Sequence, residues 1–166
     1  MVEMFLEVKN EFPDFIMVLM GVGFHSPEKS KIEELILKNN LQDSFLMLPW
    51  MKREDIFPII KNAKLYISTS RYEGLPYSII ESMAIGKAFV VTDCDGNRDL
   101  VQQGVNGFVV DQNNLVEQMP KAICTLLNNE QKRNEFEKNS LTLFHQNYNI
   151  EKTIGKLEAI YEEFAP

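Results

Sequence analysis

Short runs of almost wholly apolar residues alternate with helical patterns along most of the chain. The apolar runs lie at 15–20, 45–48, 65–69, 88–92 and 108–110. The helical patterns lie at 1–9, 53–62, 76–85 and 97–103, with another opening at Ser26 and Pro27, and after residue 111 at 115–128, 130–147 and 150–164. Strands that are apolar throughout belong to parallel sheets covered by helices on both faces. The sequence therefore predicts an α/β fold with a Rossmann-like, doubly wound parallel sheet.

Composition excludes several classes of protein. The chain has 166 residues, enough for one domain with a real core, and its net charge of -7 argues against broad nucleic-acid binding. Cys94 and Cys124 are too few for a disulfide framework and are expected to be free thiols. The longest apolar stretch, 15–24, is too short to cross a bilayer, and no signal peptide is evident. We expect a cytoplasmic protein.

Two glutamates, Glu73 and Glu81, bracket the transition from a strand to a helix. Glu73 follows the apolar run at 65–69, and Pro76 is a typical residue with which to open a helix. Gly86 is a typical residue to close it, so Glu81 lies about a turn and a half inside. Both carboxylates, and the free N–H groups of the first helical turn, can therefore face one crevice.

The chemistry of this unit indicates a ligand that is part phosphate and part sugar. Free backbone N–H groups and the helix dipole favour a phosphate. Ionised carboxylates accept hydrogen bonds from sugar hydroxyls. In doubly wound sheets ligands bind beyond the carboxyl ends of the strands, and the loops around Gly21 and Trp50 also follow apolar runs.

Other interpretations of the same residues stay open at this point. The glutamate pair can be solvated surface charge, Gly21 and Gly23 can form a simple tight turn, and Trp50 can be a packing residue. Asp93-Cys94-Asp95 imitates a metal-binding motif. His25 and His145 have no carboxylate or cysteine partner at ligand spacing, so we expect no metal site.

The segments 69–76 and 81–87, with strand 89–92, Gly96 and 106–110, resemble the central motif of a known family almost position for position. The chain is similar to the C-terminal, donor-binding half of retaining GT-B glycosyltransferases, the group-1 family that uses nucleotide sugars. The resemblance extends over about 15–110. It implies transfer of a hexosyl group from a nucleoside diphosphate sugar, UDP- or GDP-linked, to an acceptor hydroxyl with retention of configuration.

The resemblance also implies a role for each matching residue. Glu73 would act at the donor sugar as the catalytic residue, and Glu81 would bind the ribose diol. The donor-binding set would be completed by the phosphate segment Gly74, Leu75, Pro76, Tyr77, Ser78 and Ile79, by Gly21 and Gly23 on the nucleotide wall, and by Trp50 and Met51 facing the base. No cofactor and no metal are implied.

For the whole protein, the resemblance implies polysaccharide or glycolipid biosynthesis. The acceptor would be a saccharide or a lipid-linked molecule bound through a separate N-terminal domain. Peripheral association with the inner face of the membrane is implied for the full-length enzyme.

The chain departs from the family pattern in three places. Pro49 stands where the family more often has Gly, and Arg98-Asp99 replaces a frequent Pro-Glu. The sequence also opens in the helix that follows the first strand of this half, and it lacks the Arg and Lys that neutralise the diphosphate after that strand. We therefore expect residues 1–166 to be a donor-binding domain truncated on its N-terminal side, without an acceptor domain and inactive alone.

The missing first strand would lie between the strands at 15–20 and 65–69. Leaving the backbone groups of two central strands unpaired is costly. We expect direct pairing of these two strands, or a strand donated by another molecule, rather than an open cleft. The alternative functions are a non-catalytic nucleotide-sugar-binding module and another enzyme on this architecture, such as a nucleotide-sugar epimerase or a sugar phosphorylase.

Overall fold

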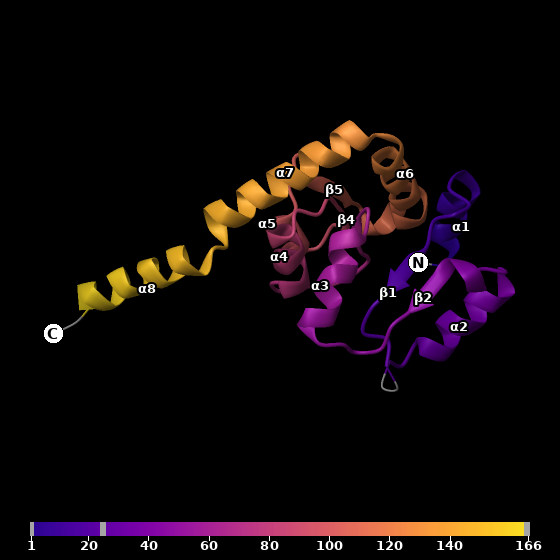
Figure 1. Ribbon diagram of the computed structural model, residues 1–166, viewed down its shortest axis with the longest axis horizontal. Coiled ribbons are helices and arrows are strands. Elements are labelled where there is room, and N and C mark those ends of the chain that lie inside the picture. Colours follow the sequence, from indigo (N-terminus) through magenta and orange to yellow (C-terminus); the bar gives the residue numbers. More distant parts are fainter. Residues whose placement is uncertain (1, 24–25, 165–166) are drawn as a thin grey trace.

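A computed structural model describes residues 2–23 and 26–164. The elements are α1 (Val2–Glu11), β1 (Met17–Leu19), α2 (Lys29–Lys38), η1 (Gln42–Ser44), β2 (Phe45–Met47), α3 (Arg53–Asn62), β3 (Tyr66–Ser68), α4 (Tyr77–Ala84), β4 (Phe89–Thr92), α5 (Asp95–Leu100), β5 (Gly107–Val110), η2 (Gln112–Asn114), α6 (Leu115–Asn128), α7 (Glu130–Asn147) and α8 (Ile150–Phe164) (Figure 1). The predicted alternation of strands and helices is confirmed.

Every strand pairing in the described residues is parallel. One sheet has the order β1-β2, with Val18 opposite Leu46. The other has the order β3-β4-β5, with Ile67 opposite Val90 and Val90 opposite Phe108. The α/β fold with a parallel, helix-covered sheet is therefore as predicted, although the strands form two sheets.

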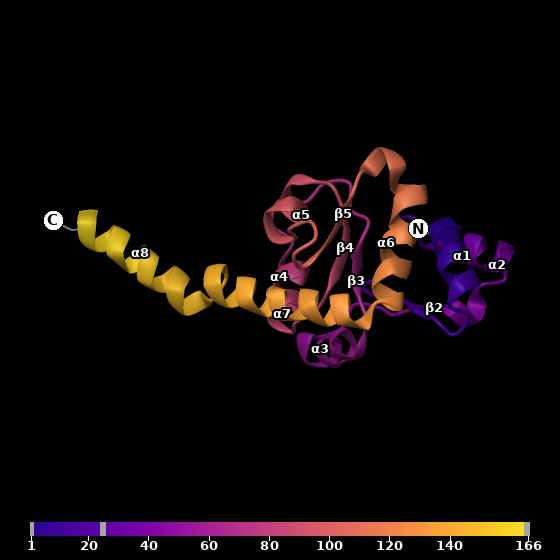
Figure 2. The same cartoon turned by 90° about the horizontal axis from the view of Figure 1, so that it is seen from above.

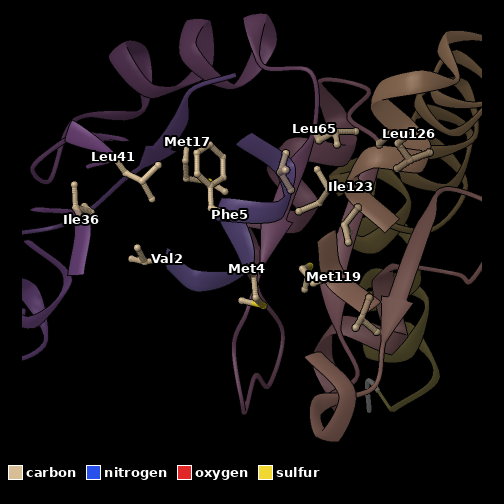
Figure 3. Close-up of a cluster of buried hydrophobic side chains, with 14 of the residues drawn as sticks. Val2, Met4, Phe5, Met17, Ile36, Leu41, Leu65, Met119, Ile123 and Leu126 are labelled. Atoms are coloured by element: carbon tan, nitrogen blue, oxygen red, sulfur yellow. The ribbon is translucent and has the colours of Figure 1, made fainter. Parts of the chain in front are cut away.

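One hydrophobic cluster joins the two sheets through α1 and α6. Phe5 of α1 is 1% exposed, and its ring lies 4.8 Å from that of Phe45 in an edge-on arrangement. Met119, Ile123 and Leu126 of α6 belong to the same cluster (Figure 3). Because α6 also contacts β4 and β5, it holds the lobe of α1, α2, β1 and β2 against the larger sheet (Figure 2).

A second cluster covers the opposite face of the larger sheet. Ile79 and Met83 of α4 pack with Phe89 and Val91 of β4. All four residues of β4 are buried, as expected for a central parallel strand. Gly86 ends α4 with φ at +75°, and its N–H donates to the carbonyl of Met83 at 2.9 Å. A glycine is the usual residue for such a left-handed helix end.

Of the two arrangements expected for β1 and β3, direct pairing is wrong, and a strand donated by another molecule stays a prediction. β1 pairs with β2 alone and β3 with β4 alone. A cavity of about 1180 Å³ lies between them, lined by residues of both strands and of α3. We attribute the separation to the packing of α1 against α6, which fixes the distance between the two sheets. Moving β1 to β3 would break that buried layer.

The last helix, α8, extends away from the body of the protein (Figures 1 and 2). Its apolar side chains Ile150, Ile154, Leu157, Tyr161 and Phe164 are all exposed. Within the described ranges, neither α8 nor any other helix combines the length and apolar character needed to cross a membrane.

Candidate functional site

The loops that follow the strands gather at one edge, because parallel strands end on the same side of their sheet. Two hydrogen bonds tie three of these loops together. Both are made by Gln112, whose side-chain Nε2 donates to the carbonyl of Arg71 at 3.0 Å and to that of Asp93 at 2.9 Å. The loops after β3, β4 and β5 therefore form one connected rim.

Glu73 is held in this rim by its side chain and by its backbone. The Ser70 hydroxyl donates to Oε1 of Glu73 at 2.7 Å. The backbone N–H of Gly96 donates to the carbonyl of Glu73 at 3.2 Å. The residue is partly exposed, and its second carboxylate oxygen accepts no hydrogen bond from the described residues.

Buried polar groups of the neighbouring strand support the Glu73 loop. Thr92, at the end of β4, donates its hydroxyl to the carbonyl of Ser70. Asn97, which is fully buried, donates from Nδ2 to the carbonyl of Thr92 at 2.9 Å and to its Oγ1 at 3.2 Å. The Asn97 Nδ2 is thus fully used, whereas its buried Oδ1 has no hydrogen-bond partner among the described residues. Buried hydrogen bonds of this kind hold the loop that they support in one arrangement. Sequence patterns did not indicate Thr92 or Asn97 as supports.

Gly96 is required by a close approach of two backbones. A Cβ atom at position 96 would lie 2.4 Å from the carbonyl oxygen of Gly74 and 2.8 Å from that of Glu73. No side chain fits there without moving the loop that carries Glu73. The start of α5 and the Glu73 loop are thus packed directly on each other.

Glu81 lies on α4 and lines the cavity between β1 and β3. Its side chain is 27% exposed, and Oε1 accepts from Nε of Arg53 at 2.8 Å. Glu73 does not line this cavity. Of the two glutamates, only Glu81 therefore faces this cavity.

Tyr66 lies near both glutamates and was not identified from the sequence. Burial raises the pKa of its phenol, a side-chain hydrogen bond with Ser78 opposes that rise, and the charges of Glu73 and Glu81 add to it. The hydroxyl is therefore protonated at neutral pH and remains a hydrogen-bond donor. From the sequence, an aromatic residue at the start of a strand indicates only that it is buried, and not that it lies beside a functional site.

The first turn of α4 provides fewer free N–H groups than the sequence suggested. Pro76 is the N-cap and has no N–H, and the N–H of Ile79 donates to the carbonyl of Pro76 at 3.0 Å. The side chain of Ile79 is 1% exposed and belongs to the core. The expectation that Ile79 presents its amide to a ligand therefore does not hold in this structure. Tyr77 and Ser78 remain as the helical donors, because no described residue accepts from their amides.

The loop after β1 lies beside the loop after β2. The N–H of Val22 donates to the carbonyl of Leu48 at 3.0 Å. Gly21 has φ at +78° and lines the cavity, which supports the turn interpretation of this glycine. Gly23 has open space where a side chain would stand and does not line the cavity.

The two residues expected to face a base differ in exposure. Trp50 is 79% exposed and Met51 is half-buried. Trp50 therefore does not pack in the core, and its ring is available to a ligand. Leu75 and Tyr77 are also exposed, at 49% and 69%, and a Cβ added at Gly74 would meet nothing within 4 Å.

Over the described residues, no group of three or more His, Cys, Asp or Glu side chains could hold a metal ion. Asp93 and Asp95 both pair with Arg98, the former at 3.1 Å. His25 lies outside the described residues.

Metal independence remains a prediction. Donor affinity is expected to change by less than about twofold in excess chelator, measured by calorimetry, since the described residues form no ligand cluster. A large loss restored by Mg²⁺ or Mn²⁺ would contradict it.

Parallel strands, covering helices and a rim of strand-end loops together give the chain a Rossmann-like α/β fold. The family model for glycosyl transferases group 1 matches residues 1–142. The chain belongs to this family.

Relatives and solved structures agree with that assignment. An uncharacterized glycosyltransferase of Haemophilus influenzae is 30% identical over 90% of this chain and 41% of its own length. The UDP-Gal:alpha-D-GlcNAc-diphosphoundecaprenol alpha-1,3-galactosyltransferase of Escherichia coli is 26% identical over 92% of this chain and 38% of its own length. The chain thus spans about two fifths of each of these relatives.

Two solved glycosyltransferases share the fold. HepE of Anabaena, crystallised with UDP, has a TM-score of 0.86 at 21% identity, over 98% of this chain and 44% of its own. TarM of S. aureus, crystallised with UDP and other ligands, has a TM-score of 0.85 at 24% identity, over 96% of this chain and 31% of its own. The fold is that of the C-terminal half of GT-B glycosyltransferases.

Proposed function

We propose that this chain is the donor-binding half of a retaining glycosyltransferase that moves a hexosyl group from a nucleoside diphosphate sugar to an acceptor hydroxyl. The observation that carries the proposal is the placement of Glu73 and Glu81 on either side of the first turn of α4, at the carboxyl edge of the sheet. The Glu73 carboxylate suits the transferred hexose and the Glu81 carboxylate suits the ribose of the nucleotide, with backbone amide donors between them.

Different residues of the rim would bind different parts of the donor molecule. The amides of Tyr77 and Ser78 face the position proposed for the diphosphate, where charge builds as the glycosidic bond breaks. Such preorganised donors stabilise a developing negative charge without reorganisation. Glu73, held by Ser70 and Gly96, would fix the hexose through its hydroxyls, which keeps the reacting carbon in place.

A uridine nucleotide is the donor class that the relatives favour. The E. coli relative is named for UDP-galactose, and HepE was crystallised with UDP and with UDP-glucose. The exposed ring of Trp50 and the half-buried Met51 lie in the loop where the base would rest. Aromatic rings stack on any base, so the ring alone does not select uracil.

We further propose that the chain works within a longer protein whose N-terminal domain binds the acceptor. The relatives are more than twice as long, and the cavity between β1 and β3 has two unpaired parallel edges suited to a further strand. The acceptor would be a saccharide or a lipid-linked molecule at the cytoplasmic side of the membrane. The name of the E. coli relative includes a lipid-linked acceptor.

The test compares the 166-residue chain with a longer protein that carries it, across UDP-, GDP- and ADP-sugars. Thermal shift and turnover are measured for each. We expect a UDP-sugar to stabilise the longer protein and be turned over. We expect the isolated chain to be inactive and to bind the donor with a Kd well above micromolar, because the cavity edges are open. Micromolar affinity with ordinary turnover by the isolated chain would contradict the two-domain proposal, and binding of no nucleotide sugar by either protein would overturn the function.

A further inference from the structure

An ion pair joins the start of α3 to Glu81. Nε of Arg53 lies 2.8 Å from Oε1 of Glu81, whereas Oε2 has no hydrogen bond or ion pair of its own within the described part of the chain. Arg53 is the first residue of α3, and Glu81 lies in the second turn of α4. The contact therefore connects two helices that β3 separates in the sequence.

Because the ion pair is largely exposed, its main effect is to orient the Glu81 side chain and not to stabilise the fold. The Arg53 side chain is 74% exposed and the Glu81 side chain 27%. A pair this exposed adds little to folding stability. It does restrict the rotamers of Glu81, which a flexible glutamate would otherwise have to lose on binding a ligand. Oε2 is left as the accessible acceptor.

A neighbouring ion pair gives a contrast. Lys52 lies 3.6 Å from Glu54, and both side chains are more than 70% exposed. This pair lies on the same segment, with both members at the surface, and neither residue lines the cavity that Glu81 faces. Lys52 does not cap α3 with its side chain either. It is therefore a matched cation for testing whether the position of Arg53 matters or merely its charge.

We propose that Arg53 is a positioning residue for nucleotide binding: it holds the Glu81 carboxylate in the orientation that accepts the ribose diol. This rests on the proposed function. The same contact ties Glu81 to the loop that carries Trp50, only three residues before Arg53 in the chain. The groups expected to hold the ribose and the base are thereby set in one geometry before the ligand arrives.

The test is a double-mutant cycle with two probes, UDP and 2′,3′-dideoxyuridine diphosphate, with each Kd measured by NMR titration of the 166-residue chain. Arg53→Ala is expected to weaken UDP binding about five- to tenfold and to leave the dideoxy probe within about twofold. In a Glu81→Ala background, Arg53→Ala should cause no further loss. Lys52→Ala should leave both affinities unchanged.

The Arg53→Lys variant tests whether Arg53 acts by donating a hydrogen bond to Glu81 or only by packing against it. The lysine Nζ reaches one bond further than Nε of arginine, so it can still donate to Oε1, and we expect UDP affinity within about threefold of the unsubstituted chain. An Arg53→Ala chain that binds UDP as tightly as before, or loses both probes equally, overturns the inference. If the unsubstituted chain binds both probes equally, the ribose role of Glu81 in the proposed function fails, and this inference with it.

Discussion

Glu81→Ala is expected to weaken UDP binding about ten- to a hundredfold, and Glu73→Ala to change it by less than about threefold. A hydrogen bond to a charged group is worth about 1.5–3 kcal/mol, and UDP carries the ribose diol but no hexose. Glu81 is the carboxylate that we assign to the ribose. Calorimetry with UDP alone measures both affinities.

Glu73→Ala should instead lower turnover in the longer enzyme, since its carboxylate is assigned to the transferred sugar. Glu135→Ala is the matched control, because this exposed glutamate lies on α7, away from the rim. Its UDP affinity should equal that of the unsubstituted chain. Equal losses of UDP affinity for the two site variants would contradict the division of roles.

Gly96→Ala is expected to destabilise the chain by about 2–3 kcal/mol, as overpacking against a rigid neighbour does. The added Cβ would lie 2.4 Å from the carbonyl oxygen of Gly74, and a backbone atom cannot move aside as a flexible side chain can. Urea denaturation measures the free energy of unfolding. The displaced loop carries Glu73, so sugar-dependent binding should fall as well.

Gly74→Ala is the control for stability. A Cβ at position 74 meets nothing within 4 Å, and its backbone is not in the left-handed region. Its free energy of unfolding should match that of the unsubstituted chain within about 0.5 kcal/mol. A Gly96→Ala chain as stable as the Gly74→Ala chain would show that the two loops do not pack as described.

Elements with a strong local pattern were predictable from the sequence. The helices α3, α6, α7 and α8 have the predicted bounds, because their periodicity and end residues are encoded locally. The first four strands were located but predicted one or two residues too long at their ends, and β5 was predicted one residue too short because it begins at Gly107. The gap between β1 and β3 was the alternative that the sequence analysis disfavoured. It depends on how α1 packs against α6, and no local sequence pattern indicates such a contact.

The candidate site shows the same division. The places of Glu73 and Glu81 followed from a strand, a proline and a helix in order. Tyr66 and Arg53 did not, because each reaches the site from an element distant in sequence from its partner. The amide of Ile79 was assigned by its position in the first turn, and its bond to Pro76 depends on the local shape of that turn.

The most direct test of the account is where UDP-glucose binds. A titration of the ¹⁵N-labelled chain at millimolar UDP-glucose reports the site as changes in amide chemical shift. The largest changes are expected at Tyr77 and Ser78 and in the helix around Glu81, at the carboxyl edge of the strands. Changes centred instead on the turn at Gly104 to Asn106, which precedes β5 at the opposite edge, would contradict the account.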